Sequence, residues 1–239
     1  MERLSSLEAW WSTELSLSSR LSPALLDAVS LAPLWRATNH ALDVLYRTCA
    51  QEAPGSECNH TEDQHVVTFL GCRVLTSTLA SLRLLLTGYY LQALAVQRDV
   101  LESTLLLQLF AVVPDAIGRW RTADARQRLR EFGAGAINNA LADRGIQTRY
   151  DVYREFCELA THPSSVSRIL TWRRDLRRHG VGPFVEPKTA HKVLLEITLN
   201  CCDACNTILD ALNDRDRFAT EWVAIEVAID EWNAAPESP

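Results

Sequence analysis

The sequence is poor in the residues that make tight turns and in the patterns that make strands. Its 239 residues include nine glycines and nine prolines, too few for a β-sandwich full of tight turns. Short runs that alternate apolar and polar residues, as half-buried strands do, are almost absent. No internal repeat appears at the period of a solenoid. These absences argue against all-β and repeat architectures and leave helices as the main element.

Motifs of several enzyme classes are also missing. The chain has no Walker loop, GxGxxG, GxSxG or HExxH, so nucleotide binding through a glycine-rich loop and serine-hydrolase chemistry are without support. The first residues carry Glu2 and Glu8 and no apolar stretch, so we expect no signal peptide. Arg73, Arg83 and Arg98 interrupt the most apolar region, which argues against a membrane span. We therefore expect a cytoplasmic protein with reduced cysteines.

Apolar residues at helical spacing are what the sequence has in abundance, with 47% of the chain hydrophobic. Two long segments of this kind, roughly 64–86 and 89–113, meet at Thr87 and Gly88. A helix of that length spans about 35 Å, and a glycine between two such helices favours an antiparallel hairpin. The loop at 53–63 precedes the first of them, and Thr61 or Asp63 can cap it.

The remaining segments also predict helices, separated by proline and glycine. They lie from Pro33 onward, from Asp115 to about Phe132, from there to Ala142 after a break at Gly133 and Gly135, and at 150–161, 187–213 and 216–233. The stretch 163–186 reads as an irregular connection with one turn around 169–173. We predict an all-α, multi-helix bundle around the central hairpin. It forms a single domain over 1–239, with N-terminal helices in 1–52, a core in 64–213, and a C-terminal helix and tail in 214–239.

Positive charge is concentrated in one part of the chain. Residues 115–180 contain 13 arginines and 8 acids, a local charge of +5 that leaves −11 for the rest of a chain with net charge −6. Such asymmetry indicates either a polyanion-binding face or ordinary solvated helix faces. The densest run, RRDLRRH, supplies candidate phosphate contacts in Arg173, Arg174, Arg177 and Arg178. The alternative for this run is again a solvated surface.

Arg98, Asp99 and Glu102 interrupt the apolar 89–113 segment. Arg98 and Glu102 are four residues apart, so they share a helix face and can pair. They form either a polar cluster that lines a cleft or an ion pair that fixes the register of the hairpin. We expect both to face inward, where loss of Glu102 costs about 3–5 kcal/mol.

A second polar set lies at the end of the 150–161 segment. Arg154, Glu158 and His162 follow one another at four-residue steps and form a stripe on one helix face. His162 precedes a proline at the helix carboxyl end, where it serves either as a general acid or base or as a simple cap. The apolar stripe beside it is expected to dock on the hairpin. We therefore predict His162 within about 10 Å of Arg98 or Glu102, a distance over which charges interact.

The cysteines raise the question of a metal or redox site. Cys202 and Cys205 have the CxxC spacing, but a structural zinc site needs four ligands and no second pair with matching spacing follows. Cys58, His60 and His65 can in principle complete a site, although nothing in their spacing requires it. A redox CxxC begins a helix after a strand, whereas this pair falls within a predicted helix. We expect core thiols and no metal.

These motifs together resemble an uncharacterised bacterial helical family. Its pattern G-Y-x(3)-A-x(4)-R-x(3)-E matches from Gly88 to Glu102, and its later Y-x(3)-[SC]-x(4)-H-P-S matches from Tyr153 to Ser164. In outline it is similar to the HEPN superfamily of helical bundles, found in toxin–antitoxin and phage-defence proteins. The resemblance covers about residues 64–213.

The resemblance implies both a fold and a possible chemistry. HEPN ribonucleases pair two subunits that each bring an arginine and a histidine from one helix. Here His162 is the corresponding proton-transfer residue, and Arg98 or Arg154 stabilises negative charge on a phosphate, with Glu102 beside Arg98. Neither a metal nor another cofactor is then required.

Two functions remain open at the level of sequence. One is a helical interaction or regulatory module of HEPN-like type, for which the resemblance implies a bacterial defence or toxin–antitoxin system. The other is a metal-independent ribonuclease or nucleotide-acting enzyme that uses His162 and an arginine. The expected partners are a second copy of the chain or another protein, with RNA as the partner of the catalytic alternative, and not a membrane.

Overall fold

The protein is an all-α helical bundle, as the sequence predicts. The computed structural model describes residues 28–49, 61–161 and 186–235, the strand residues 172–173 and 178–179, and scattered positions between 12 and 25. Within this part of the chain the only strands are β1 (Trp172–Arg173) and β2 (Arg178–His179), which pair antiparallel. The predicted turn around 169–173 is therefore wrong for residues 172 and 173, which are extended.

The central hairpin is formed by α3 (Glu62–Leu86) and α4 (Tyr90–Val112). Thr61 begins α3 with a capping box, in which its hydroxyl accepts from the Gln64 backbone and the Gln64 side chain accepts from the Thr61 backbone. Gly88 between the helices has a φ of 80°, a left-handed conformation that glycine adopts without strain. Cap and turn thus confirm the predicted hairpin at its predicted position.

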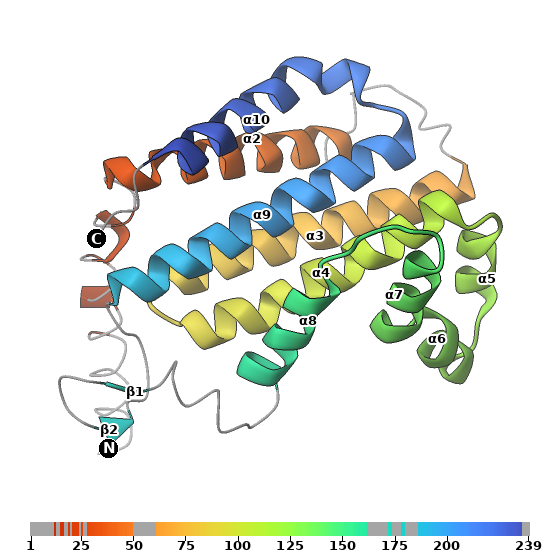
Figure 1. Ribbon diagram of the computed structural model, residues 1–239, viewed down its shortest axis with the longest axis horizontal. Coiled ribbons are helices and arrows are strands. Elements are labelled where there is room, and N and C mark those ends of the chain that lie inside the picture. The colour runs from red at the N-terminus through yellow and green to blue at the C-terminus, as the bar shows by residue number, and fades with distance from the viewer. Residues whose placement is uncertain are drawn as a thin grey trace.

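Further helices cover the hairpin in layers (Figure 1). The long α9 (Pro187–Leu212) runs beside α3 and α4, and α2 (Ala32–Cys49), preceded by the 3₁₀ turn η1 (Val29–Leu31), lies on the other side of α9. A 3₁₀ turn, η4 (Asp216–Phe218), leads into α10 (Ala219–Ala234), which packs along α2. The first and last described long helices are therefore neighbours.

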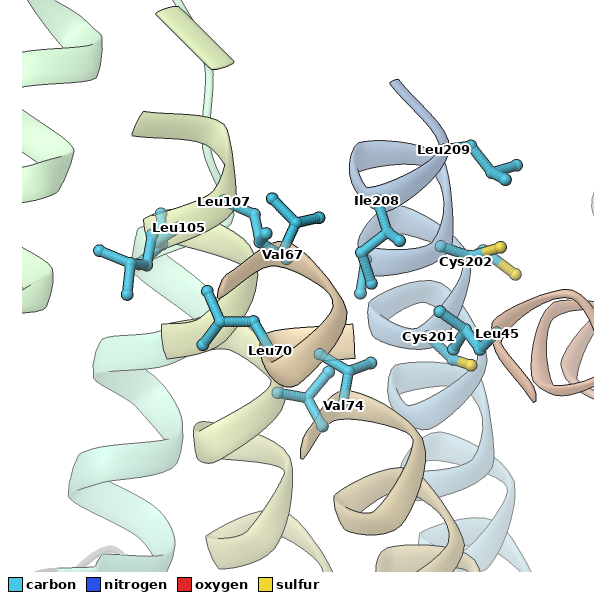
Figure 2. Packing of buried hydrophobic residues seen from close by; sticks show 14 of the residues in the cluster. Leu45, Val67, Leu70, Val74, Leu105, Leu107, Cys201, Cys202, Ile208 and Leu209 are labelled. Atoms are coloured by element: carbon cyan, nitrogen blue, oxygen red, sulfur yellow. The ribbon is translucent and has the colours of Figure 1, made fainter. Parts of the chain in front are cut away.

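The core lies where α2, α3, α4 and α9 meet. Figure 2 shows Leu45 of α2 close to Cys201 of α9, and Val67 of α3 close to Ile208 of α9. A Cβ atom added at Gly71 would lie 2.2 Å from the Cys49 sulfur, so the lack of a side chain at this glycine lets α2 approach α3 closely. Small residues therefore set the spacing of these helices.

Short helices lie beside α4, the first three near its carboxyl end and the fourth farther toward its amino end (Figure 1). They are α5 (Ala116–Thr122), α6 (Ala125–Phe132), α7 (Ala134–Ala142) and α8 (Tyr150–Phe156), the last continued by the π-helical turn η2 (Cys157–Thr161). The single helix predicted over 115–132 is wrong, because Asp124 accepts a hydrogen bond from the Gln127 backbone at 2.7 Å and begins a new helix there. Gly133 separates α6 from α7 as predicted, whereas Gly135 lies inside α7.

One described helix, α3, has the length and composition to cross a membrane. A core helix of a soluble protein passes the same test, and 39% of the most apolar window of α3 is buried inside the bundle. This is weak evidence for a span, and the cytoplasmic location stays a prediction.

Candidate functional site

The charged residues of α4 do not form the buried pair that we expected. Arg98 and Glu102 are 3.7 Å apart, but their side chains are 32% and 43% exposed, so water screens the pair. Asp99 is bound more firmly. It accepts three hydrogen bonds from the Arg73 side chain, two of them from Nε at 2.9 and 3.0 Å and one from Nη2, and one from Ser77 at 2.8 Å. The predicted contact between Arg98 and Glu102 is therefore confirmed, but the pair is only partly buried, and Asp99 is the residue that links α4 to α3.

The helix α8 docks on this polar face of α4, as the sequence predicts. The guanidinium of Arg98 lies 5.8 Å from the centre of the Tyr153 ring. Burial, followed by the nearby Glu102 carboxylate, raises the pKa of Tyr153 to about 12. Tyr153 also stacks on Tyr150, with ring centres 5.7 Å apart. The prediction that the 150–161 segment docks on the hairpin is thus confirmed.

The described part of the chain places no other predicted site residue on this face of α4. Arg154 points into solvent with 69% of its side chain exposed, and its partner Asp151 is 3.9 Å away on the same helix. His162 lies outside the described residues, as do Arg174 and Arg177. Backbone pairing sets Arg173 opposite Arg178 in β1 and β2. Their proposed roles in proton transfer and phosphate binding stay predictions.

The cysteines of α9 are core thiols, as expected. Cys201, Cys202 and Cys205 are at most 8% exposed, and they lie well inside a helix. Burial raises the pKa of the Cys202 thiol to about 12 and raises those of its two neighbours as well, so all three stay protonated. Cys58 and His60 lie outside the described residues. In the described part, no group of three His, Cys, Asp or Glu side chains has the arrangement of a metal site.

A buried polar network that the sequence did not reveal joins α4, α8 and α9. The Asn200 amide donates to the Gln97 side chain at 3.0 Å, and both residues are almost fully buried. The Asn200 oxygen in turn accepts from Arg149, which also donates to Glu196 at 2.7 Å. The signal in the sequence is that Gln97 follows Tyr90, Ala93 and Leu94 at helical spacing within an apolar stripe.

A cavity of about 370 Å³ opens between the hairpin and the α5–α6 pair. Its walls are largely apolar, with Trp120 of α5 held edge-on to Phe110 of α4 at 6.0 Å between ring centres. Four charged side chains complete the lining: the bases Arg73 of α3 and Arg128 of α6, and the acids Asp99 and Glu102 of α4. Of the three charged residues of α4 that stood out in the sequence, Asp99 and Glu102 therefore line a cavity and Arg98 does not.

The mouth of this cavity exposes large apolar side chains. Phe69 on α3 is 54% exposed and Leu129 on α6 is 79% exposed. Arg126 and Arg128, also exposed on α6, make no ion pair within the described residues. We call Phe69, Arg126, Arg128 and Leu129 the basic rim. Sequence reasoning missed it because a lone leucine among arginines normally faces the core.

Comparison with known proteins adds no further evidence. No protein-family model matches the chain, and neither the curated proteins nor the solved structures include a similar one. The resemblance to the HEPN superfamily therefore stays a prediction.

Proposed function

We propose that the protein is a helical interaction module that binds a partner protein at the basic rim and in the cavity behind it. The partner presents an acidic segment with one apolar face. The role is regulatory rather than catalytic, and the bacterial defence or toxin–antitoxin setting implied by the resemblance belongs to this proposal.

The observation that carries the proposal is the exposure of Phe69 and Leu129 at the mouth of one cavity. Exposed apolar side chains scattered singly are ordinary, but a pair that frames an apolar cavity is typical of a binding site. Aromatic residues and arginine are enriched at protein interfaces, and the basic rim supplies both. The two unpaired arginines favour a partner with carboxylates at the edge of the contact.

The alternative, a metal-independent ribonuclease, is supported by no geometry in the described residues. Arg98 lies over the ring of Tyr153 and beside Glu102, and Arg154 points away into solvent. Neither arginine is aimed into a cavity that would hold a phosphate. We therefore treat ribonuclease activity as the competing outcome of the test.

A synthetic peptide tests the binding surface directly. The probe is a labelled amphipathic helix with leucine on one face and glutamate on the other, and fluorescence anisotropy measures its binding. We expect Leu129→Asp to weaken binding at least about tenfold, because it removes the apolar anchor and repels the peptide carboxylates. Leu79→Asp is the matched control, since Leu79 is half exposed on α3 and does not line the cavity.

Two results would contradict the proposed function. One is equal peptide binding by the Leu129→Asp and wild-type proteins. The other is cleavage of an RNA oligonucleotide by the wild-type protein that His162→Ala abolishes, since this would establish the catalytic alternative.

A further inference from the structure

The chain carries a second groove whose chemistry is opposite to that of the basic rim. This groove, of about 500 Å³, runs between α9 and α10. Its lining includes Leu199, Trp222, Ile225 and Ile229, which give it an apolar floor. Three carboxylates, those of Asp203, Glu226 and Asp230, also line it, and no basic side chain does. We call this the acidic groove.

The charge of the acidic groove is only partly neutralised within the described part of the chain. Asp230 makes no ion pair there, and Glu226 accepts one hydrogen bond, from the indole of Trp222 at 2.7 Å. Arg215 lies over the ring of Trp222, 5.7 Å from its centre, where the charge of Glu226 reaches it, but its hydrogen bonds go to Asp210 and Asn206. The helix α10 as a whole carries four acids and no base. The groove therefore offers the negative charge of Asp230, and part of the charge of Glu226, beside apolar surface.

Asp203, the third acid that lines the groove, also indicates a site that favours positive charge. Burial raises the pKa of its carboxyl, and the charge of Arg149 only partly opposes this effect. The Arg149 guanidinium itself donates to Asn200 and Glu196. A cation that entered the groove would stabilise the charged form of this carboxyl.

The basic rim has the complementary shape and charge. On α6, Leu129 stands out with 79% of its surface exposed, between Arg128 and Arg130. Three arginines against one glutamate give the helix a charge of +2. An apolar side chain flanked by cations matches an apolar groove edged by carboxylates.

Within one molecule these two surfaces cannot meet. Figure 1 shows α10 along the top of the bundle and α6 at the lower right, with α9, α3 and α4 between them. Contact between them therefore requires two molecules. Because the two surfaces differ, the contact is head-to-tail, which leads to a ring or an open chain rather than a two-fold dimer.

We propose that the partner of the basic rim is a second copy of this chain, whose acidic groove receives Leu129 and the arginines of α6. This inference rests on the proposed function, because it names the partner of the same surface. A contact built on one short helix is small, and most of its attraction is between charges near water. We therefore expect an association that rises with protein concentration and weakens with salt.

Sedimentation velocity of the full chain and two variants tests the arrangement. Leu129→Asp disables α6 and leaves the groove intact, whereas Glu226→Gln with Asp230→Asn neutralises the groove and leaves α6 intact. All three positions are exposed, so the variants should fold, and circular dichroism melts check this. Leu79→Asp serves again as the control that should associate like the wild type.

The expected result is specific to a head-to-tail contact. The wild-type protein associates as its concentration rises, and each variant alone sediments as a monomer. An equimolar mixture of the two variants forms a dimer and goes no further, because it contains one intact α6 and one intact groove that meet.

Three outcomes would overturn the inference. In the first, the wild-type protein is monomeric at every concentration while the peptide probe still binds; this rejects the second copy and keeps the proposed function. In the second, both variants associate as the wild type does, which places the contact elsewhere. In the third, a monomeric wild type binds single-stranded RNA and Arg128→Glu abolishes this binding, which makes the rim a polyanion site.

Discussion

Asp203 on α9 is a carboxylate with little water around it and no cation bonded to it in the described residues. Burial raises its pKa above 3.8 in the folded protein, so deprotonation costs more in the folded than in the unfolded chain. The unfolded chain loses this proton first as the pH rises. Stability therefore falls as the pH rises from 3.8 to the folded pKa, and the loss persists at neutral pH.

We predict that Asp203→Asn stabilises the protein at neutral pH. The amide has nearly the same shape and no charge, so the loss described above disappears. The advantage should vanish below pH 3.8, where the carboxyl is protonated in both states. Thermal melts at dilute protein concentration across this pH range measure the effect. A variant that is less stable at neutral pH would mean that the carboxylate has a favourable partner.

Two acids of α4 differ in how they are bonded: Glu102 pairs with Arg98, whereas Asp99 accepts hydrogen bonds from Arg73 and Ser77. We predict that Glu102→Ala costs less than about 1 kcal/mol, because the 3.7 Å pair with Arg98 is open to water. Asp99→Ala should cost more, about 1–1.5 kcal/mol, because hydrogen bonds from both Arg73 and Ser77 are lost, although Arg73 is half exposed and water then hydrates it. Chemical denaturation gives both values. The reverse order would restore the buried Arg98–Glu102 pair.

At the scale of helices, the buried amides fix how α4 meets α9. We predict that Asn200→Leu destabilises the fold by about 2–3 kcal/mol, because the Gln97 oxygen and one Arg149 donor lose their partner in the core. Adding Gln97→Leu should recover part of the loss, since an apolar pair leaves fewer unmet groups. Denaturation of both single variants and the double variant measures the coupling. Strictly additive losses would show that the two amides act independently.

Helix ends were predictable wherever one residue determines them. Thr61 supplies the cap of α3, and Gly88 supplies the left-handed turn after it, so the hairpin follows from local sequence. The break between α5 and α6 was missed because Asp124 is an ordinary helix-surface residue until its side chain turns back to cap Gln127. The π-helical turn at the end of α8 has no counterpart in the apolar pattern.

The candidate site was less predictable than the helices, for a physical reason. The helix α4 is apolar almost all round, so its pattern does not say which side α8 and α9 cover. Sequence reasoning therefore selected Arg98 and Glu102, which lie half exposed, and passed over Gln97, which is buried. The basic rim depends on α6 standing away from the core, and this is decided by the break at Asp124 rather than by hydrophobic periodicity.

At the scale of the whole molecule, the helices differ widely in how firmly they are held. Thirteen residues of α4 and thirteen of α9 are buried, against Ala116 alone in α5 and Phe132 alone in α6. Helices with few buried apolar contacts open locally at a lower free energy than the core. The surface that we propose for binding therefore lies on the least anchored part of the described bundle.

We predict that backbone amides of α5 and α6 exchange with deuterium far faster than those of α4 and α9. Exchange followed by mass spectrometry on peptic fragments measures this difference. The peptide probe, or a second copy of the chain, should slow exchange in α6 and leave α3 near Leu79 unchanged. Uniform protection across the bundle would show that α5 and α6 are as firmly held as the core.

The packing of α10 along α2 has a consequence for how the chain folds. The hairpin of α3 and α4 joins neighbours in sequence, so its loop closes at little entropic cost and it can form early. The contacts of α9 and α10 with α2 join segments more than a hundred residues apart, and these close last. On the ribosome, α2 emerges before α9 and α10, the helices that pack against it. The face of α2 that packs against them therefore lacks these two neighbours until most of the described chain has been made.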